Sequence, residues 1–330
     1  MVTIGHAIVD VLGHADDGFL EAHGLVKGSM ELVDENRAVP IYEAMAASSF
    51  RSASALLEQS GGSAANTSVV ASMLGASTTF IGKVRNDELG NTFATDLHAV
   101  GVRYATPRAP QDGVATGRSL INVTPDAERT MCTFLGAARG LRVPDMDEDV
   151  LTGAAVTYVE GYLWDEPEAH AALEHAIATV RGAGRRFSFT LSDPFLVDRF
   201  RGEFLALASS SVDVLFANEH EICSLFETDD LDEAIARIAP MCEMTTITQG
   251  AKGSLVVHSG EVVSADAWPV DTVVDTTGAG DAYAGGFLYA LTKGLPVRRC
   301  AEIGNIAAAE VISRLGARPT DALSALVHRA

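Results

Sequence analysis

Basic residues are scarce in this chain. Only 24 Lys and Arg residues stand against 44 Asp and Glu residues, which gives a formal net charge of −20. A surface that binds nucleic acid or an anionic membrane needs a concentration of Lys and Arg to neutralise phosphates. The composition therefore argues against both kinds of partner.

Cysteine is also rare, and the cysteines are far apart. Cys132, Cys223, Cys242 and Cys300 form no C-x-x-C pair. Disulfide-stapled proteins are small and rich in cysteine, and structural zinc sites use closely spaced cysteine and histidine ligands. We therefore expect reduced thiols, with neither a disulfide framework nor a zinc site.

Long hydrophobic runs are missing as well. No window of about 18 residues is free of charges and turn formers, so the sequence predicts no transmembrane helix. Residues 1–10 lack the basic start and the apolar run of a secretory signal peptide. We therefore expect a cytoplasmic protein without a membrane partner.

Along the sequence, short β-rich runs alternate with longer helical patterns. Such alternation is typical of βαβ units with a parallel sheet. Strands are expected at residues 2–9, 78–81, 187–191, 212–217 and 245–248, a hairpin at 254–258 and 261–265, and helices at 63–74, 219–226, 279–293 and 297–314. The length of 330 residues suits one large α/β domain with a smaller addition.

Two regions interrupt this alternation. Residues 14–50 and 101–137 contain short strand-like pieces among many turn residues, for example at 117–123 and 129–134. An antiparallel β lid built from these two segments would explain the interruption. Residues 1–13, 51–100 and 138–330 would then form the α/β core.

The most specific feature is Asp275-Thr-Thr-Gly-Ala-Gly-Asp281, which opens a predicted helix. Gly278 and Gly280 allow a tight turn and a close approach of the backbone to a ligand. The N–H groups of Gly278, Ala279 and Gly280 would point at one spot at the positive end of the helix, which is suited to a phosphate. Asp281 could accept a hydroxyl proton there, so the segment is equipped for phosphoryl transfer to an alcohol. The alternative is an Asp cap with glycines that only serve the turn.

Other phosphate-binding motifs are excluded. The chain contains no G-x-x-x-x-G-K-[ST] string, and Tyr283 stands where a G-x-G-x-x-G fingerprint needs its third glycine.

Five motifs together resemble the ribokinase (PfkB) family of ATP-dependent sugar and nucleoside kinases over nearly the whole chain. They are residues 61–67, 80–90, 218–221, 248–253 and 275–281. One departure is Arg85, which stands where the second motif usually has glycine. The resemblance implies a ribokinase-like fold, in which a mostly parallel central sheet has helices on both faces and carries a small β-sheet lid.

The resemblance also implies roles for individual residues. Asp281 takes the position of the catalytic base, and a Glu at a helix start suits a hydrated Mg²⁺ ion. The ATP-binding positions are Asn218, Glu221, Thr248, Gly250, Gly253 and Asn305, with Glu221 holding Mg²⁺ through water; a monovalent cation such as K⁺ would lie near Asp275, Thr277 and Ser313. The alternative for Asn218 and Glu221 is a helix cap with an exposed acid.

Within the family, the adenosine kinase branch is the most similar. The start Gly5-His-Ala-Ile-Val-Asp10 resembles that branch, although His6 stands where the branch usually has Asn. The resemblance implies that Asp10, Gly62 and Asn66 hold the two ribose hydroxyls, and a carboxylate and an amide suit a vicinal diol. It therefore predicts phosphorylation of the 5′-hydroxyl of adenosine.

A nucleoside kinase also needs an apolar slot for a purine. The candidates from the lid and its border are Met131, Phe134, Leu135, Tyr162, Leu163 and Trp164, for each of which ordinary packing is the alternative. Arg129 would reach the phosphates or the substrate, or else pair with a surface acid.

Two other functions stay open. One is a PfkB-type sugar kinase that acts on ribose, fructose or a keto-deoxy sugar acid. The other is a nucleoside-binding sensor without catalysis, against which Asp281 and the intact glycine turn argue. The expected partner is a small-molecule nucleoside or sugar, and the expected assembly is a monomer or a homodimer.

Overall fold

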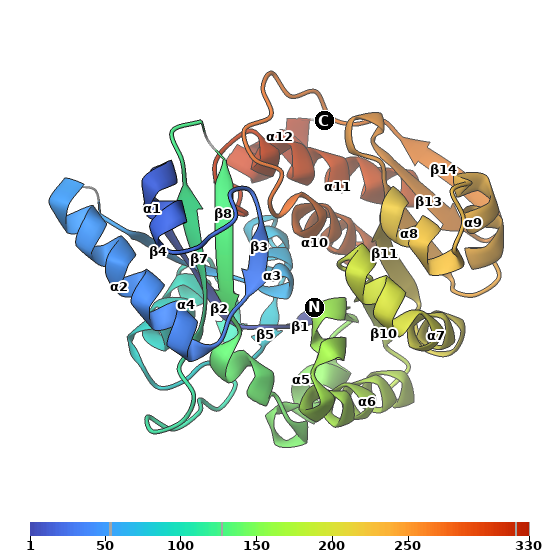
Figure 1. Ribbon diagram of the computed structural model, residues 1–330. Coiled ribbons are helices and arrows are strands. Elements are labelled where there is room, and N and C mark those ends of the chain that lie inside the picture. Colours follow the sequence, from blue (N-terminus) through green and yellow to red (C-terminus); the bar gives the residue numbers. More distant parts are fainter. Residues whose placement is uncertain (53–54, 127, 321, 330) are drawn as a thin grey trace.

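The computed structural model describes residues 1–52, 55–126, 128–320 and 322–329, and these residues form two β-sheets (Figure 1). The larger sheet has the strand order β14-β13-β12-β11-β10-β9-β1-β5-β6. Its strands are β1 (Val2–Ile4), β5 (Thr79–Ile81), β6 (Arg103–Tyr104), β9 (Val156–Glu160), β10 (Arg186–Thr190), β11 (Val214–Asn218), β12 (Met244–Thr248), β13 (Ser254–His258) and β14 (Glu261–Ala265). Neighbouring strands are parallel except in the pairs β12–β13 and β13–β14.

The helices lie around the larger sheet and beside the smaller one (Figure 1). They are α1 (Asp17–Ala22), α2 (Glu35–Ser52), α3 (Ser63–Met73), α4 (Glu88–Ala99), α5 (Glu148–Gly153), α6 (Pro167–Gly182), α7 (Pro194–Ser210), α8 (Glu219–Phe226), α9 (Leu231–Ile238), α10 (Ala279–Thr292), α11 (Val297–Ile312) and α12 (Ala322–Arg329). Short 3₁₀ turns are η1 (Gly136–Gly140), η2 (Val143–Asp145), η3 (Gly161–Asp165) and η4 (Gly250–Lys252).

Helices cover both faces of the larger sheet. Along β11, Val214 and Phe216 belong to the buried cluster that contains α3, α10 and α11, and Phe216 packs edge-on against aromatic rings of α10. Leu215 and Ala217 belong to a second cluster that contains α6, α7, α8 and α9. Successive side chains of a strand point to opposite faces, so a strand buried on both faces serves two cores. The predicted α/β architecture is confirmed.

The smaller sheet has the order β3-β8-β7-β2-β4. Its strands are β2 (Ile8–His14), β3 (Met30–Leu32), β4 (Leu57–Gly61), β7 (Gly117–Val123) and β8 (Arg129–Phe134). The pairs β2–β4 and β7–β8 are antiparallel, whereas β2–β7 and β3–β8 are parallel. The expected antiparallel pairing is therefore only partly correct, because long crossover connections also allow parallel partners.

The expected strand at residues 2–9 is wrong, because the chain leaves the larger sheet after Ile4 and enters the smaller one at Ile8. Strands β2 and β4 thus extend the smaller sheet into the ranges 1–13 and 51–100, which were predicted as core. Residues 14–50 hold one short strand, and most of the rest is helical. Buried Ala38, Ile41 and Met45 in α2 have helical spacing, which the abundance of turn residues obscured. The division of the chain into core and lid domains stays a prediction.

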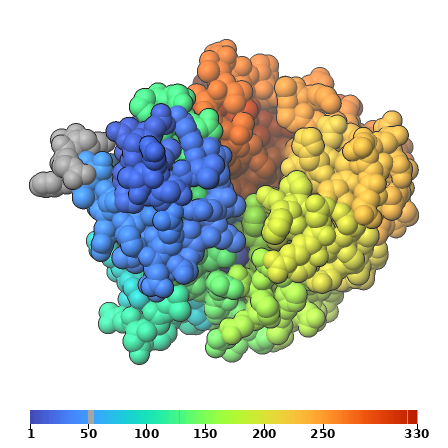
Figure 2. All heavy atoms as spheres, in the orientation of Figure 1, coloured from blue at the N-terminus to red at the C-terminus, as the bar shows by residue number. Residues whose placement is uncertain are grey.

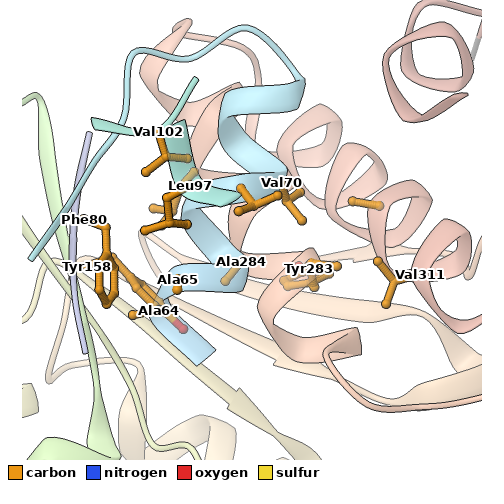
Figure 3. Packing of buried hydrophobic residues seen from close by; sticks show 14 of the residues in the cluster. Ala64, Ala65, Val70, Phe80, Leu97, Val102, Tyr158, Tyr283, Ala284 and Val311 are labelled. Carbon is orange, nitrogen blue, oxygen red and sulfur yellow. The ribbon is translucent and has the colours of Figure 1, made fainter. Parts of the chain in front are cut away.

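Close packing of α3 on α10 brings together segments that are far apart in the sequence. Figure 3 shows Ala64, Ala65 and Val70 of α3 near Ala284 of α10. A Cβ atom at Gly285 would lie 2.7 Å from the Thr67 carbonyl oxygen, so only glycine allows this approach. The N-terminal turns of α3 and α10 therefore lie side by side.

Candidate active site

Two cavities adjoin between the sheets, and Figure 2 shows the hollow between the blue N-terminal segment and the yellow segment of the chain. We call the first, of about 520 Å³, the turn cavity because residues 276–281 line it. The second, of about 420 Å³, is the lid pocket, which lies between β3 and the start of α7. Ile8, Gly62, Ser63 and Tyr162 line both cavities, so the two are neighbours.

The glycine turn caps α10. Gly278 is the N-cap with φ of 77°, in the left-handed region, and a Cβ atom there would lie 2.6 Å from the Ala317 Cβ atom. The N–H group of Ala279 donates to the Thr276 carbonyl at 3.2 Å. Among the described residues, the N–H groups of Gly278, Gly280 and Asp281 have no acceptor. The free donors thus differ from the predicted set, with Asp281 in place of Ala279.

Asp281 faces the turn cavity and is held by two side chains of α3. Ser63 Oγ donates to Asp281 Oδ1 at 2.6 Å, and Asn66 Nδ2 donates to Asp281 Oδ2 at 3.1 Å. The surrounding protein desolvates the carboxyl group and raises its pKa, while the two hydrogen bonds act in the opposite direction. A carboxylate with a raised pKa beside free amides is suited to accept a proton next to an anion.

The three predicted diol-binding residues lie together. Asp10, Gly62 and Asn66 all line the turn cavity. Desolvation raises the pKa of Asp10 to about 6, although the charges of Arg318 and Arg129 lower it. The carboxylate and the amide therefore face the same space as Asp281.

Asn218 and Glu221 form a capping box at the start of α8. Asn218 Oδ1 accepts the Glu221 N–H group at 2.8 Å, and Glu221 Oε2 accepts the Asn218 N–H group at 3.0 Å. Both side chains also line the turn cavity, so the capping role and a ligand-binding role are compatible. Burial raises the pKa of Glu221 to about 7.

The turn cavity has an acidic lining, although the described residues contain no cluster of three or more metal-ligating side chains. Asp10, Glu221 and Asp281 line it, and no described Lys, Arg or His residue does. Glu221 is buried and has no ion-pair partner among the described residues. A carboxylate such as that of Glu221 suits a hydrated Mg²⁺ ion held through water, and such an ion would reduce the repulsion between a polyphosphate and these carboxyls.

The other predicted nucleotide-binding residues divide into two groups. Thr248, at the end of β12, lines the turn cavity, whereas Gly250, Gly253 and Asn305 do not. Asn305 Nδ2 donates to the carbonyl oxygens of Ala265 and Asp266 at 3.1 and 3.0 Å. This part of the predicted set lies beside β14, at some remove from Asp281.

The predicted monovalent-cation residues are engaged within the protein. The Asp275 carboxylate accepts the N–H groups of Thr277 and Gly316, and Arg129 Nη2 lies 2.8 Å from Asp275 Oδ2. The Ser313 hydroxyl donates to the Glu310 carbonyl at 2.7 Å. Arg129 therefore supplies a positive charge beside Asp275. A monovalent cation near these residues, liganded largely by backbone carbonyls, stays a prediction.

The lid pocket contains only part of the predicted purine slot. Leu135 and Tyr162 line it. Phe134 and Leu163 belong to the buried cores, and Trp164 packs against Phe189 and Phe204. The pocket instead takes apolar side chains that the sequence did not indicate: Ile8, Met30, Leu32, Phe195 and Leu196. Met30, Leu32 and Phe195 are exposed, so they are not part of the periodic pattern of buried apolar residues by which core positions are recognised in a sequence.

Two further groups at the site were missed. Glu160, at the end of β9, accepts the N–H groups of His6 and Ala64 at 2.7 and 2.8 Å, and burial raises its pKa to about 8. Arg318 donates to Asn66 Oδ1 at 3.2 Å. A charged residue at the end of an apolar strand was a usable signal for Glu160, whereas nothing around Arg318 in the sequence indicated its contact.

The comparisons with known proteins agree on one family. The family described as "pfkB family carbohydrate kinase" matches residues 34–323. Adenosine kinase 2 of Arabidopsis thaliana is 28% identical, over 96% of this chain and 94% of its own length. The crystal structure of adenosine kinase from Sinorhizobium meliloti is 42% identical with a TM-score of 0.89, covering 99% of this chain and 98% of that one. A protein of Rhizobium etli CFN 42 described as a probable sugar kinase has the same identity and TM-score, covering 99% and 97%.

These structures confirm the predicted ribokinase-like fold. Among the described residues, no helix has the length and apolar character that crossing a membrane requires.

Proposed function

The chain belongs to the pfkB family of carbohydrate kinases, and from this premise we propose that it transfers the γ-phosphoryl group of ATP to the 5′-hydroxyl of adenosine. The kinase activity and the similarity to the adenosine kinase branch, both predicted from the motifs, are confirmed. The proposal concerns the acceptor and the roles of the residues. Its main support is the position of Asp281, beside free amides of α10 and in the turn cavity, which adjoins the lid pocket.

Asp281 acts as the general base in this proposal. It takes the proton of the 5′-hydroxyl as that oxygen bonds to the γ-phosphorus and the bond to the bridging oxygen of ADP breaks. The N–H groups of Gly278, Gly280 and Asp281 stabilise the charge of the transferred group at the positive end of α10.

Mg²⁺ belongs to the nucleotide side of the proposal. Glu221 and Asn218 hold it through water, and when bound it neutralises charge on the β- and γ-phosphates. The absence of Lys and Arg from the described lining of the turn cavity supports this assignment.

The lid pocket favours a neutral, partly apolar acceptor. Its carboxyl groups are Glu160, Asp165, Glu166 and Asp193, and no described Lys or Arg lines it. Asp165 and Glu166 are paired with Arg199 and Arg139, and burial raises the pKa of Glu160 to about 8, so these three carboxyls add little free negative charge. The lining instead lacks a described cation that would bind the carboxylate of a keto-deoxy sugar acid, which argues against that acceptor. Apolar side chains suit a purine better than the polyhydroxy surface of ribose or fructose. Asp10, Gly62 and Asn66 would hold the ribose diol at the border with the turn cavity.

A panel of acceptors tests the proposal. Adenosine, other nucleosides, ribose, fructose and a keto-deoxy sugar acid are incubated with ATP and Mg²⁺, and the phosphorylated product is quantified. We expect the highest kcat/KM with adenosine. A higher value with ribose or fructose identifies a sugar kinase instead, and ligand binding without any product identifies a sensor. A cytoplasmic location, and a monomeric or homodimeric assembly, stay part of the proposal.

A further inference from the structure

Arg318 lies in a part of the chain with no predicted role and contacts Asn66, which is bonded to the base. It follows Ala317, which packs against Gly278. Its Nε atom donates to Asn66 Oδ1 at 3.2 Å, and its Nη1 atom donates to Ser60 Oγ at 2.7 Å. Its Nη2 atom is buried and has no hydrogen-bond partner among the described residues.

The chemistry of a guanidinium group determines how the Asn66 amide is oriented. Arginine has hydrogen-bond donors and no acceptor, so the Asn66 atom that faces Arg318 must be the oxygen. The NH₂ group then faces the other way, toward Asp281 Oδ2 at 3.1 Å. Without Arg318, the Asn66 oxygen loses its donor and only the contact with Asp281 holds the amide, so the position of the amide is less well fixed.

We propose that Arg318 is a positioning residue for catalysis: it fixes the orientation of the Asn66 amide, and through that amide it holds the base Asp281. This inference rests on the proposed role of Asp281. Asn66 is the intermediate group, because Arg318 has no hydrogen bond to Asp281 itself.

The charges around the base make this arrangement significant. The carboxyls of Asp10 on β2 and Glu160 on β9 interact electrostatically with Asp281, and so do the phenol groups of Tyr158 and Tyr162, whose pKa values burial raises. Burial lowers the pKa of Arg318 to about 10, which leaves it charged at neutral pH. Arg318 also lowers the pKa of Asp10, because its positive charge stabilises the ionised carboxylate.

A double-mutant cycle tests the proposal with the acceptor that the wild type phosphorylates best. Arg318→Met should lower kcat about 10- to 100-fold, as expected when a buried polar group loses its partner, with little change in the KM for ATP. Arg318→Lys should recover part of the loss, because lysine keeps the charge and one donor. In an Asn66→Ala background, Arg318→Met should have little further effect, because the intermediate group is gone.

The pH profile separates positioning from a structural role. Arg318→Met should move the acidic limb of kcat to higher pH, because Asp281 loses a donor that stabilises its ionised form. Arg299→Met is the matched control, since Arg299 is half-buried and bonded to Glu302 and the Val327 carbonyl, away from the base. The proposal is overturned if the effects of Arg318→Met and Asn66→Ala on kcat are fully additive. It is also overturned if Arg318→Met leaves the acidic limb of the kcat–pH profile unshifted.

A failure of the proposed kinase function can be distinguished from a failure of the positioning role of Arg318. If no acceptor is phosphorylated, the pKa of Asp281 is measured by ¹³C carboxyl NMR, with Asp281→Asn identifying the signal. A higher Asp281 pKa in Arg318→Met supports the positioning role whatever the acceptor. An unchanged pKa contradicts it. If Arg318→Met does not fold, the same titration is made with Arg318→Lys, which should give a smaller rise.

Discussion

Ser63 Oγ lies 2.6 Å from Asp281 Oδ1, although 218 residues separate the two in the chain. Ser63 begins α3 and Asp281 lies in the first turn of α10, so this bond joins two helix N-termini. The positive ends of both helices therefore meet at one carboxylate, which favours its charged form against the effect of desolvation.

Asp281→Asn should remove most of the turnover. An amide cannot accept the proton, so kcat should fall about 10²- to 10⁴-fold, the usual contribution of a general base. The ATP dissociation constant should stay nearly the same, because the backbone amides of the turn remain. Steady-state kinetics and an ATP titration check both values, and activity within tenfold of wild type would disprove the assignment.

Gly278→Ala should destabilise the turn. A left-handed φ and contact with Ala317 both oppose a side chain there, which should lower the free energy of unfolding by about 1–3 kcal/mol. Gly280→Ala is the matched control for stability, because a Cβ atom at Gly280 meets nothing within 4 Å. Denaturant unfolding of both variants measures the difference, and equal stabilities would contradict the strain at Gly278.

Glu221→Gln should raise the Mg²⁺ concentration needed for half-maximal activity. Loss of an outer ligand commonly costs about 10- to 100-fold in metal affinity, while glutamine can still accept the Asn218 N–H group of the cap. Glu219→Gln is the control, since Glu219 lies in the same helical turn but is bonded to Gln249. Mg²⁺ titrations at saturating ATP measure the effect, and similar curves for the two variants would remove Glu221 from the metal site.

The KM for the acceptor should rise at acidic pH. The pKa of Asp10 is raised to about 6, so below this pH the group is protonated and loses acceptor capacity toward substrate hydroxyls. Above it the carboxylate is ionised and the KM should be constant. Asp10→Asn should have a high KM that does not change in this range. Initial rates between about pH 5 and pH 8 separate KM from kcat, and a constant wild-type KM throughout would contradict the role of Asp10.

Local features of this protein were predictable because short-range geometry produces them. The spacing of Asn218 and Glu221 is that of a capping box, and the structure contains that box. The glycines at 278 and 280 indicated a turn at a helix start, which is also present. The strands β7 and β8 appeared where β-rich runs predicted them.

Contacts between distant segments were not predictable in the same way. The pairing of Arg129 with Asp275 was missed because either residue could have paired with another group on the surface. The exposed Met30 and Phe195 lack a core periodicity, so nothing in their neighbourhoods indicated that they border one pocket.

The sequence by itself determined the helix cap at Asn218 and Glu221 and the glycine turn beside Asp281, because residue types and spacings of a few residues leave helix and turn geometry little freedom. The roles of base, cation ligand and diol-binding groups are predictions that the family resemblance implies. Only the tertiary structure decided how the groups meet. The packing of α3 on α10 at Gly285 places Asn66 between Asp281 and Arg318, and the departure of β2 from the larger sheet places Asp10 in the same cavity. Such contacts depend on close approach between whole elements, which no local pattern encodes.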